Sequence, residues 1–386
     1  MTSAENELMS DQASPEFGLA RAAREVAILA AQHADQAEQE RLIHPEVARA
    51  VVANGFTRHF VPVSNGGNAG TFSELSAALV TVGTHCPATA WCASIAANLA
   101  RMAAYLPEEG RKEVWRDGPD TFVVGAVSPK GKAVPEEDGW RLSGSWSYIS
   151  AVDHSEWALV LGIAQVDGAG EPRLFALPRS DYRVEPTWSD IGMRATGSNT
   201  LVVEDVFVPS TLSVVAKDLL EGNAPEPAAN CHSVPLPAVN GLSFCLPMLG
   251  AAEGALEHWS TYAESRIRTC EAAPGPGPGR GFYEETLARS SGEIDAAGLL
   301  LDRVAAVADR GAISPQQTAR SQRDCALAAD LLVSAVDRLF RASGTGGHSE
   351  SSPLQRWWRD IHSAAGHIVL QFGPAAAAYA RRMLDV

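Results

Sequence analysis

Residues 142–157 contain the side chains whose types and spacing best suit the binding of a flat ring. Alternation over residues 142–149 predicts a β-strand that ends at Ser150, with Tyr148 shortly before it. An aromatic side chain can stack on a planar group, and a hydroxyl can donate or accept a hydrogen bond beside it. Ser150 could equally satisfy a local turn. The pattern therefore indicates either a ring-binding strand end or an ordinary turn.

Three histidines are candidates for the site, one of them, His367, for managing protons. His85 lies just before a predicted helix, and His362 and His367 lie near the C-terminus. An imidazole exchanges a proton near neutral pH, which suits general acid or base catalysis. Histidines on helices are often purely structural, and that role remains the alternative for each of the three.

Composition and charge restrict the class of protein. The chain has 386 residues, 46% of them hydrophobic, so it is long and apolar enough for two or three packed units. A formal net charge of -15 and a pI near 5.1 argue against nucleic acid and anionic membranes as partners. The segment before Phe17 lacks the features of a signal peptide, and no apolar run reaches the length of a membrane span. We therefore expect a soluble, cytoplasmic protein.

The six cysteines are scattered along the chain without the short spacing that is typical of a zinc site. They are Cys86, Cys92, Cys231, Cys245, Cys270 and Cys325. In a cytosolic protein such cysteines are usually buried, unreactive thiols. We therefore expect buried thiols, and neither a metal centre nor a disulfide framework.

Hydrophobic periodicity divides the chain into three expected domains, at 17–118, 119–230 and 231–386. The first has helical spacing, with an amphipathic helix predicted over 72–82 and an almost wholly apolar helix over 87–105. The second consists of short β-rich runs bounded by turn residues. Helical patterns return in the third, where several long helices would form a bundle.

Three stretches of the C-terminal part carry apolar stripes at helical spacing, at 248–262, 326–340 and 361–378. Residues 273–279 alternate between proline and glycine, which excludes a helix and predicts a surface loop. Residues 218–237 are rich in Pro, Ala and Asn, and we predict a linker between the β part and the bundle.

The order of helical, β and helical parts, together with residues 191–209, resembles the acyl-CoA dehydrogenase superfamily. Three further motifs resemble more closely the flavin-dependent monooxygenases that share this fold. They lie at 87–91 (PATAW), 146–157 (WSYISAVDHSEW) and 353–362 (PLQRWWRDIH). The resemblance covers nearly the whole chain and implies an α+β fold. It would have an N-terminal α-helical domain, a central β-barrel or β-sandwich domain and a C-terminal four-helix bundle.

Residues 55–62 and 102–107 also resemble the hydroxylases of actinorhodin biosynthesis, which oxidise an aromatic polyketide. The resemblance implies the oxygenase component of a two-component monooxygenase in secondary metabolism. Reduced FMN or FAD would react with O2 to give a C4a-hydroperoxide, which hydroxylates a polyketide, phenol or quinol. Epoxidation and oxidative ring cleavage by the same hydroperoxide remain alternatives to hydroxylation. The chain lacks a strand, Gly-x-Gly-x-x-Gly and helix unit for a nicotinamide cofactor, so a separate NAD(P)H:flavin reductase would supply the reduced flavin.

The resemblance also assigns residues to the flavin ring. Tyr148 would stack on the isoalloxazine, and the Ser150 hydroxyl would accept the hydrogen bond of the proton that reduced flavin carries on N5. Ser128 would approach the pyrimidine side of the flavin, with a plain strand terminus as the alternative. Trp91 would border the flavin pocket, with ordinary core packing as the alternative.

Other residues would bind the phosphate end of the flavin. Arg266 matches the superfamily arginine that reaches the flavin phosphates of a neighbouring subunit, so the resemblance implies a homo-oligomer, a tetramer in this family. Gly346 and Gly347 lie where backbone amides approach the phosphates. A solvated helix face for the arginine and a helix cap for the glycines are the alternatives.

The C-terminal region distinguishes two kinds of chemistry. Acyl-CoA dehydrogenases need a carboxylate base, commonly in a Tyr-Glu-Gly-Thr-like turn, whereas this chain has IHSAAGHI at 361–368. By the resemblance, His367 would instead lie beside the flavin and manage protons at the bound oxygen or the substrate. His362 and His85 are candidates for the substrate cavity.

Three alternatives remain at this stage. An acyl-CoA dehydrogenase-type flavoenzyme would need a buried carboxylate that faces the flavin. An amino-sugar N-oxygenase would keep the flavin chemistry and change only the substrate cavity. A non-catalytic paralogue that binds a ligand or partner would fail to bind reduced flavin.

Overall fold

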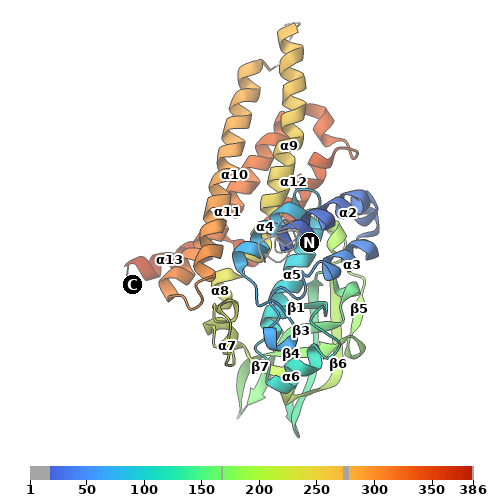
Figure 1. Cartoon of the computed structure of the whole chain (residues 1–386), viewed down its shortest axis with the longest axis vertical. Helices are drawn as coiled ribbons and strands as arrows, with labels where there is room; N and C mark the ends of the chain where they lie inside the picture. The colour runs from blue at the N-terminus through green and yellow to red at the C-terminus, as the bar shows by residue number, and fades with distance from the viewer. Residues whose placement is uncertain (1–17, 167, 273–277, 385–386) are drawn as a thin grey trace, which may run out of the picture.

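The computed structural model describes residues 18–166, 168–272 and 278–384. Figure 1 shows a β-sheet at one end of the molecule, long C-terminal helices at the other end, and N-terminal helices between them. The predicted order of helical, β and helical parts is confirmed. Within these ranges, no helix combines the length and the apolar composition needed to cross a membrane.

The N-terminal helices are α2 (Gly18–Glu40), α3 (Pro45–Ala53), α4 (Phe72–Gly83), α5 (Pro87–Ala103) and α6 (Glu108–Val114). Helix α4 begins after Thr71, whose hydroxyl accepts a hydrogen bond from the backbone N–H of Glu74 (3.1 Å). Helix α5 begins at Pro87, whose fixed φ suits the first turn. Almost all of α5 is buried, because its small side chains pack against α4, the sheet and a C-terminal helix. The predicted apolar helix is confirmed.

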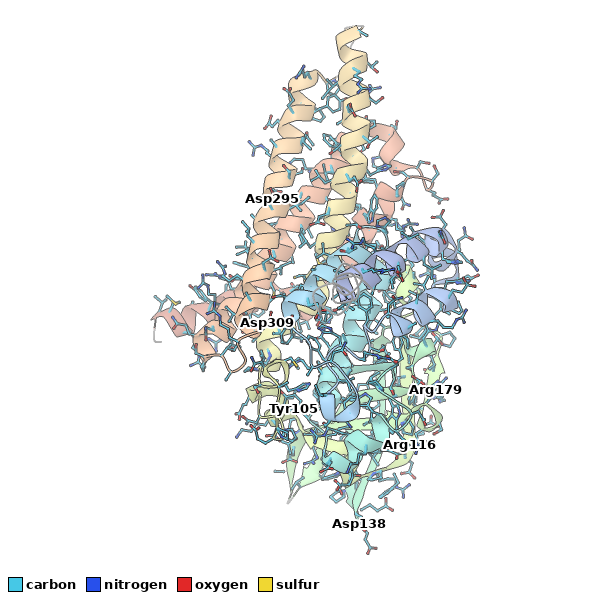
Figure 2. All side chains as sticks on the ribbon, in the orientation of Figure 1. Tyr105, Arg116, Asp138, Arg179, Asp295 and Asp309 are labelled. Carbon is cyan, nitrogen blue, oxygen red and sulfur yellow. The ribbon has the colours of Figure 1, made fainter. Side chains whose placement is uncertain are left out.

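Seven strands form the sheet, in the order β5-β6-β2-β1-β3-β4-β7. They are β1 (Val123–Glu136), β2 (Gly139–Ile149), β3 (Trp157–Val166), β4 (Ala169–Pro178), β5 (Arg183–Glu185), β6 (Asn199–Pro209) and β7 (Ser213–Val215). Strands β1 and β3 are parallel, and the other pairs are antiparallel. Asp138, in the turn between β1 and β2, lies at the free end of the sheet (Figure 2). Because Ile149 pairs with Asn199, the residues just beyond β2 and just before β6 come together.

The C-terminal helices are α7 (Ala216–Glu221), α8 (Leu236–Val239), α9 (Leu242–Ala272), α10 (Arg280–Ala308), α11 (Pro315–Ala342), α12 (Pro353–Ala365) and α13 (Phe372–Leu384). Helices α9 to α12 pack on one another as the predicted four-helix bundle, and α13 packs against α11. The end of α9 and the start of α10 extend furthest from the sheet (Figure 1). The first half of α9 also packs on α4 and α5, so it connects the bundle to the N-terminal helices.

The segment predicted as a linker, 218–237, does connect the sheet to the C-terminal helices, and part of it is packed against the end of α5 rather than free. The fully buried guanidinium of Arg101 donates from Nη1 to the backbone oxygens of Cys231 and Val234, both at 3.1 Å. The hydroxyl of Tyr105, labelled in Figure 2, donates to the backbone oxygen of His232. Polar side chains that satisfy backbone groups in this way hold an irregular segment in a buried position.

The apolar stripe at 361–378 is interrupted, which corrects the expectation of one helix. Helix α12 ends at Ala365, a single 3₁₀ turn covers Ile368–Leu370, and α13 begins at Phe372. Pro374 lies in the first turn of α13, where its missing N–H costs nothing; in the interior of a continuous helix it would remove a hydrogen bond. The break places His367 in a link between two helices rather than on a helix.

The remaining sequence predictions concern the loops and the thiols. Of the predicted loop at 273–279, residues 273–277 lie outside the described part of the chain. Five cysteines are free and buried, as expected, and the side chain of Cys270 is outside the described set. Burial raises the pKa of Cys92 and that of Cys231 (to about 11), so both thiols stay protonated at neutral pH.

Candidate active site

The hydroxyl of Ser150 lies directly after β2, as predicted, and is buried. The indole N–H of Trp91, on α5, donates a hydrogen bond to Ser150 Oγ (3.0 Å). A second hydroxyl, that of Ser198, lies 2.9 Å from the same oxygen. Ala151 follows with a φ of 59°, so the chain turns sharply as it leaves the strand. The two segments that the sequence singled out, at 142–157 and 191–200, therefore meet at Ser150.

The hydroxyl contacts continue from Ser198 into the loop before β6. Ser198 Oγ lies 2.6 Å from the hydroxyl oxygen of Thr196, and the Thr196 hydroxyl donates to the backbone oxygen of Met193 (2.8 Å). The backbone N–H of Ala151 donates to the backbone oxygen of Thr196 (2.8 Å), which holds the loop against the end of β2. Sequence reasoning missed Ser198 and Thr196 as site residues, although both lie in the segment that carried the resemblance.

Three rings pack together beside Ser150. The imidazole of His367 stacks on Phe244, with ring centroids 3.8 Å apart and planes inclined by 26°. The indole of Trp91 lies 4.9 Å from Phe244 and 6.3 Å from His367, again between ring centroids. Trp91, Ser150 and His367, which the sequence proposed separately, are therefore neighbours. Phe244, in the first turn of α9, was missed, because an aromatic residue in an apolar helix gives no signal of its own.

Burial determines the protonation state of His367. Desolvation lowers the pKa of its imidazole to about 4, so the ring is neutral at neutral pH. Its Nδ1 accepts a hydrogen bond from the backbone N–H of Val369 (3.3 Å). In a neutral imidazole the proton must then be on Nε2. No other hydrogen bond of this ring is present within the described residues, so Nε2–H is available as a donor.

An apolar cavity of about 470 Å³ lies between the sheet and the C-terminal helices, and none of Trp91, Ser150, Phe244 and His367 lines it. The residues that line it include Val127 and Pro129, on either side of Ser128, and Ile368 and Val369, which follow His367. The cavity wall is mostly apolar, as is usual for sites that bind flat organic molecules.

Two of the predicted flavin contacts are exposed on this chain. Tyr148 is 70% exposed, has a φ of 67°, and touches the ring of Trp188 edge-on (6.1 Å between centroids). Ser128 is exposed on β1. Neither side chain belongs to the buried cluster, and their assignments stay predictions.

The other predicted residues are not brought to the cluster. His362, on α12, has its Nε2 3.0 Å from Asp337 Oδ1 on α11, and His85 is exposed, with its ring bonded to the neighbouring Thr84 (2.7 Å). Gly346 and Gly347 belong to the 3₁₀ turn Gly344–His348 after α11. Arg266 is exposed on α9. Within one chain these residues lie apart from Ser150. A role for them at a flavin bound beside Ser150 would therefore need contacts that one chain does not provide.

Helix α12 holds the loop that contains Thr196 and Ser198. The buried carboxylate of Asp360 accepts from the backbone N–H of Met193 (2.5 Å). Desolvation and the nearby charge of Glu38 raise the pKa of Asp360 to about 7. Gly192 touches α12 so closely that a Cβ at this position would lie 2.1 Å from the backbone oxygen of Arg359. These contacts were not foreseen, although Asp360 and Arg359 belong to the motif at 353–362.

Comparisons with known proteins agree with this architecture. Residues 242–372 match the family described as acyl-CoA dehydrogenase, C-terminal domain. The oxygenase subunit HsaA of a flavin-dependent monooxygenase from Mycobacterium tuberculosis is 31% identical to the chain over 346 residues. The match covers 86% of this chain and 87% of HsaA. The chain belongs to the oxygenase subunits of flavin-dependent monooxygenases.

Two further relatives support this family. The oxygenase component of the FADH(2)-dependent resorcinol hydroxylase from Rhizobium sp. is 28% identical to this oxygenase subunit, over 97% of this chain and 96% of its own. The structure of XiaF from Streptomyces sp., in complex with FADH2 and glycerol, has a TM-score of 0.89 and 26% identity, covering 98% of both chains. The predicted acyl-CoA dehydrogenase-like fold and the flavin-dependent monooxygenase assignment are confirmed. The closer resemblance to the actinorhodin hydroxylases is not established by these matches.

The residues of the site fit a reduced flavin. Ser150 Oγ uses its hydrogen bonds to Trp91 and Ser198 and retains one lone pair, which can accept from a ring N–H. His367, which is half-buried, offers an N–H donor nearby. The dehydrogenase alternative would need a carboxylate among these rings, whereas the buried carboxylate of Asp360 is bonded to the loop at Met193.

Proposed function

We propose that this oxygenase subunit receives reduced flavin from a separate NAD(P)H:flavin reductase and uses it with dioxygen to hydroxylate an aromatic compound. The observation that carries the proposal is the packing of Trp91, Ser150, Phe244 and His367 into one cluster, in which the first three are buried and His367 is half-buried. It combines an acceptor hydroxyl, a neutral N–H donor and apolar rings. Reduced flavin supplies the electrons that activate dioxygen, and the protein must position and protect that chemistry.

Ser150 would bind the N5–H of the flavin, and Tyr148 and Ser128 would contact its ring system. The indole of Trp91 holds the Ser150 oxygen in place from the side of α5. Trp91 and Phe244 are both buried, so they exclude water from one side of the site. Exclusion of water strengthens each polar contact inside the site and limits side reactions.

His367 would act as a hydrogen-bond donor rather than as a general base. Its lowered pKa keeps the ring neutral, and the bond from Val369 to Nδ1 leaves the proton on Nε2. A fixed donor of this kind stabilises negative charge that develops on a reacting oxygen. The stack on Phe244 and the Val369 contact together determine the ring orientation.

The substrate we propose is an aromatic polyketide or a smaller phenol or quinol of secondary metabolism. The mostly apolar cavity of about 470 Å³ beside Ile368 and Val369 supports a flat organic substrate. The named resorcinol hydroxylase supports a phenol. Substrate profiling with phenols, quinols and amino sugars distinguishes this proposal from an amino-sugar N-oxygenase.

We propose further that the active unit is a homo-oligomer, a tetramer by analogy with the family. Each of the three proposed domains would contribute one residue to the site: Trp91 from 17–118, Ser150 from 119–230 and His367 from 231–386. Arg266, Gly346 and Gly347 would then bind the phosphate end of a flavin held by a neighbouring subunit. Reduced FAD and reduced FMN are both candidates; the resorcinol hydroxylase that is FADH(2)-dependent and the XiaF structure in complex with FADH2 support reduced FAD.

The experiment is an anaerobic titration of the full chain with reduced FAD and reduced FMN, followed by mixing with oxygenated buffer and a phenol. We expect saturable binding of reduced flavin and formation of hydroxylated product. Ser150→Ala should weaken binding of reduced flavin by up to about tenfold, the value of one hydrogen bond. Ser213→Ala, which removes a buried hydroxyl on β7, is the matched control. Failure to bind either reduced flavin would refute the proposal, and reduction of bound oxidised flavin by an acyl thioester would support the dehydrogenase instead.

A further inference from the structure

We propose that Trp91, Ser198 and Thr196 orient the Ser150 hydroxyl so that it can only accept a hydrogen bond from a bound flavin, and that this orientation selects reduced over oxidised flavin. The inference rests on the proposed function, because it assumes that Ser150 meets flavin N5. It adds a reason for the choice of redox state and assigns positioning roles to Trp91, Ser198 and Thr196.

The hydroxyls of Ser150, Ser198 and Thr196 form a series of hydrogen bonds, and a group of fixed direction stands at each end of the series. At one end is the indole N–H of Trp91, which can only donate, and which donates to Ser150 Oγ (3.0 Å). At the other end is the backbone oxygen of Met193, which can only accept, and which lies 2.8 Å from the hydroxyl oxygen of Thr196. Each hydroxyl between these ends has a single proton to donate.

The assignment of each proton then follows in order. Thr196 donates its proton to Met193, so at the 2.6 Å contact Thr196 must accept from Ser198. Ser198 has then used its proton, so at the 2.9 Å contact it must accept from Ser150. Ser150 donates to Ser198 and accepts from Trp91. One lone pair of Ser150 Oγ remains, and no proton remains to be donated.

The opposite direction is unfavourable. If Thr196 donated to Ser198, the Thr196 and Met193 oxygens would face each other at 2.8 Å without a proton between them. The three hydroxyls are buried, at 6% exposure or less, so water cannot replace the lost bond easily. The loop cannot simply move away, because Ala151 bonds to the backbone oxygen of Thr196 and Asp360 bonds to Met193.

The two redox states of a flavin differ at the atom that Ser150 would meet. Reduced flavin carries a proton on N5 and donates a hydrogen bond, whereas oxidised flavin has an unprotonated N5 that can only accept. A Ser150 hydroxyl that can only accept forms a hydrogen bond with the N5–H of reduced flavin. With oxidised flavin, a lone pair of Ser150 Oγ would face the lone pair of N5 without a proton between them. A subunit that takes reduced flavin from a reductase and releases oxidised flavin needs this preference.

The test measures the dissociation constants of oxidised and reduced FAD, with FMN in parallel, under anaerobic conditions for the full chain. We expect the wild-type chain to bind reduced flavin at least about tenfold more tightly. Ser198→Ala leaves the Ser150 proton without an acceptor, so it can turn toward the flavin. The preference should fall by about fivefold or more. Ser198→Thr keeps the hydroxyl and should retain the preference, as should the matched control Ser213→Ala.

Thr196→Val serves as the second variant if Ser198→Ala does not fold, as judged by circular dichroism and thermal unfolding. It lets Ser198 donate to Ser150 and should reduce the preference in the same way. Equal binding of both redox forms by the wild-type chain, or an unchanged preference in a folded Ser198→Ala variant, overturns the inference while the proposed function stands. Absence of any binding of reduced flavin to the wild-type chain overturns the proposed function as well, so the two failures are distinguishable.

Discussion

The imidazole of His367 stacks on the phenyl ring of Phe244, with ring centroids 3.8 Å apart. The two residues belong to different structural units, since Phe244 lies in the first turn of the long helix α9 and His367 lies between α12 and the following 3₁₀ turn. The stack therefore connects the link that carries His367 to the helix that packs on α4 and α5. It determines where the Nε2–H of His367 can point.

Phe244→Leu should impair the chemistry more than the binding of flavin. The change retains an apolar side chain and removes the stacking contact, which is worth about 0.5–1.5 kcal/mol. We expect the fraction of oxidised flavin that is coupled to product to fall by up to about tenfold, with reduced-flavin affinity changed much less. The measurement is product formed per reduced flavin consumed. Phe282→Leu, at a partly exposed position on α10, is the control, and equal coupling in both variants would contradict the role of the stack.

His367→Gln and His367→Ala should differ, because glutamine retains an N–H donor and alanine does not. Loss of a preorganised donor should lower the rate of product formation about a hundredfold in the alanine variant. The pKa of His367 is lowered to about 4, so the wild-type rate should show no step from this residue between pH 5.5 and 8. The check is a single-turnover pH profile. A step near pH 6.5 that disappears in His367→Gln would show that the ring acts as a base.

Gly192→Ala should disturb the loop that carries the hydroxyl contacts. A Cβ here would lie 2.1 Å from the backbone oxygen of Arg359, so α12 and the loop must separate. We expect a loss of about 1–3 kcal/mol in the free energy of unfolding, together with weaker binding of reduced flavin. Urea unfolding and flavin titration measure the two effects. Gly298→Ala on α10 is the control, since its Cβ would meet only Leu249 at 3.9 Å, and it should be neutral or slightly stabilising.

Asp360→Asn should stabilise the protein more at high pH than at low pH. The folded-state pKa of Asp360 is raised to about 7, above its ordinary value of 3.8, because the buried charge is desolvated and lies near Glu38. Between these values the unfolded chain releases the proton that the folded chain retains, so wild-type stability falls as pH rises. Asparagine has no proton to lose and can still accept from the backbone N–H of Met193.

The advantage of Asp360→Asn over wild type should therefore grow by about 3 kcal/mol between pH 5 and pH 8. Urea unfolding of both proteins at the two pH values measures this difference directly. Glu185→Gln, at a partly exposed position on β5 where the carboxylate pairs with Arg183, serves as the control for a general effect of charge removal. An Asp360→Asn advantage that is the same at both pH values would show that the carboxyl is ionised at pH 5 as well.

Local features of the site could be predicted from sequence, because each depends on neighbouring residues. Alternation up to Ile149 predicted the strand that places Ser150 at its end, and the run of small residues predicted the buried helix that carries Trp91. The apolar stripe at 361–378 misled, because its spacing continues across a break that is signalled only by Gly366, at the end of α12, and by Gly373 and Pro374, in the first turn of α13. The loop-like composition of 218–237 predicted a linker but gave no sign that Arg101, on α5, and Tyr105, just beyond it, would donate to its backbone.

By itself, the sequence determined the order of the parts and the strand end at Ser150, since periodicity and residue type act over short distances. The choice of His367 came from the resemblance to the flavin-dependent monooxygenases. Only the tertiary structure decided which of these residues meet. The contact of Ser150 with Ser198 follows from the pairing of β2 with β6, and the stack of His367 on Phe244 follows from the packing of the bundle on the N-terminal helices. The neutral state of His367 and the raised pKa of Asp360 are likewise consequences of burial, which no local pattern specifies.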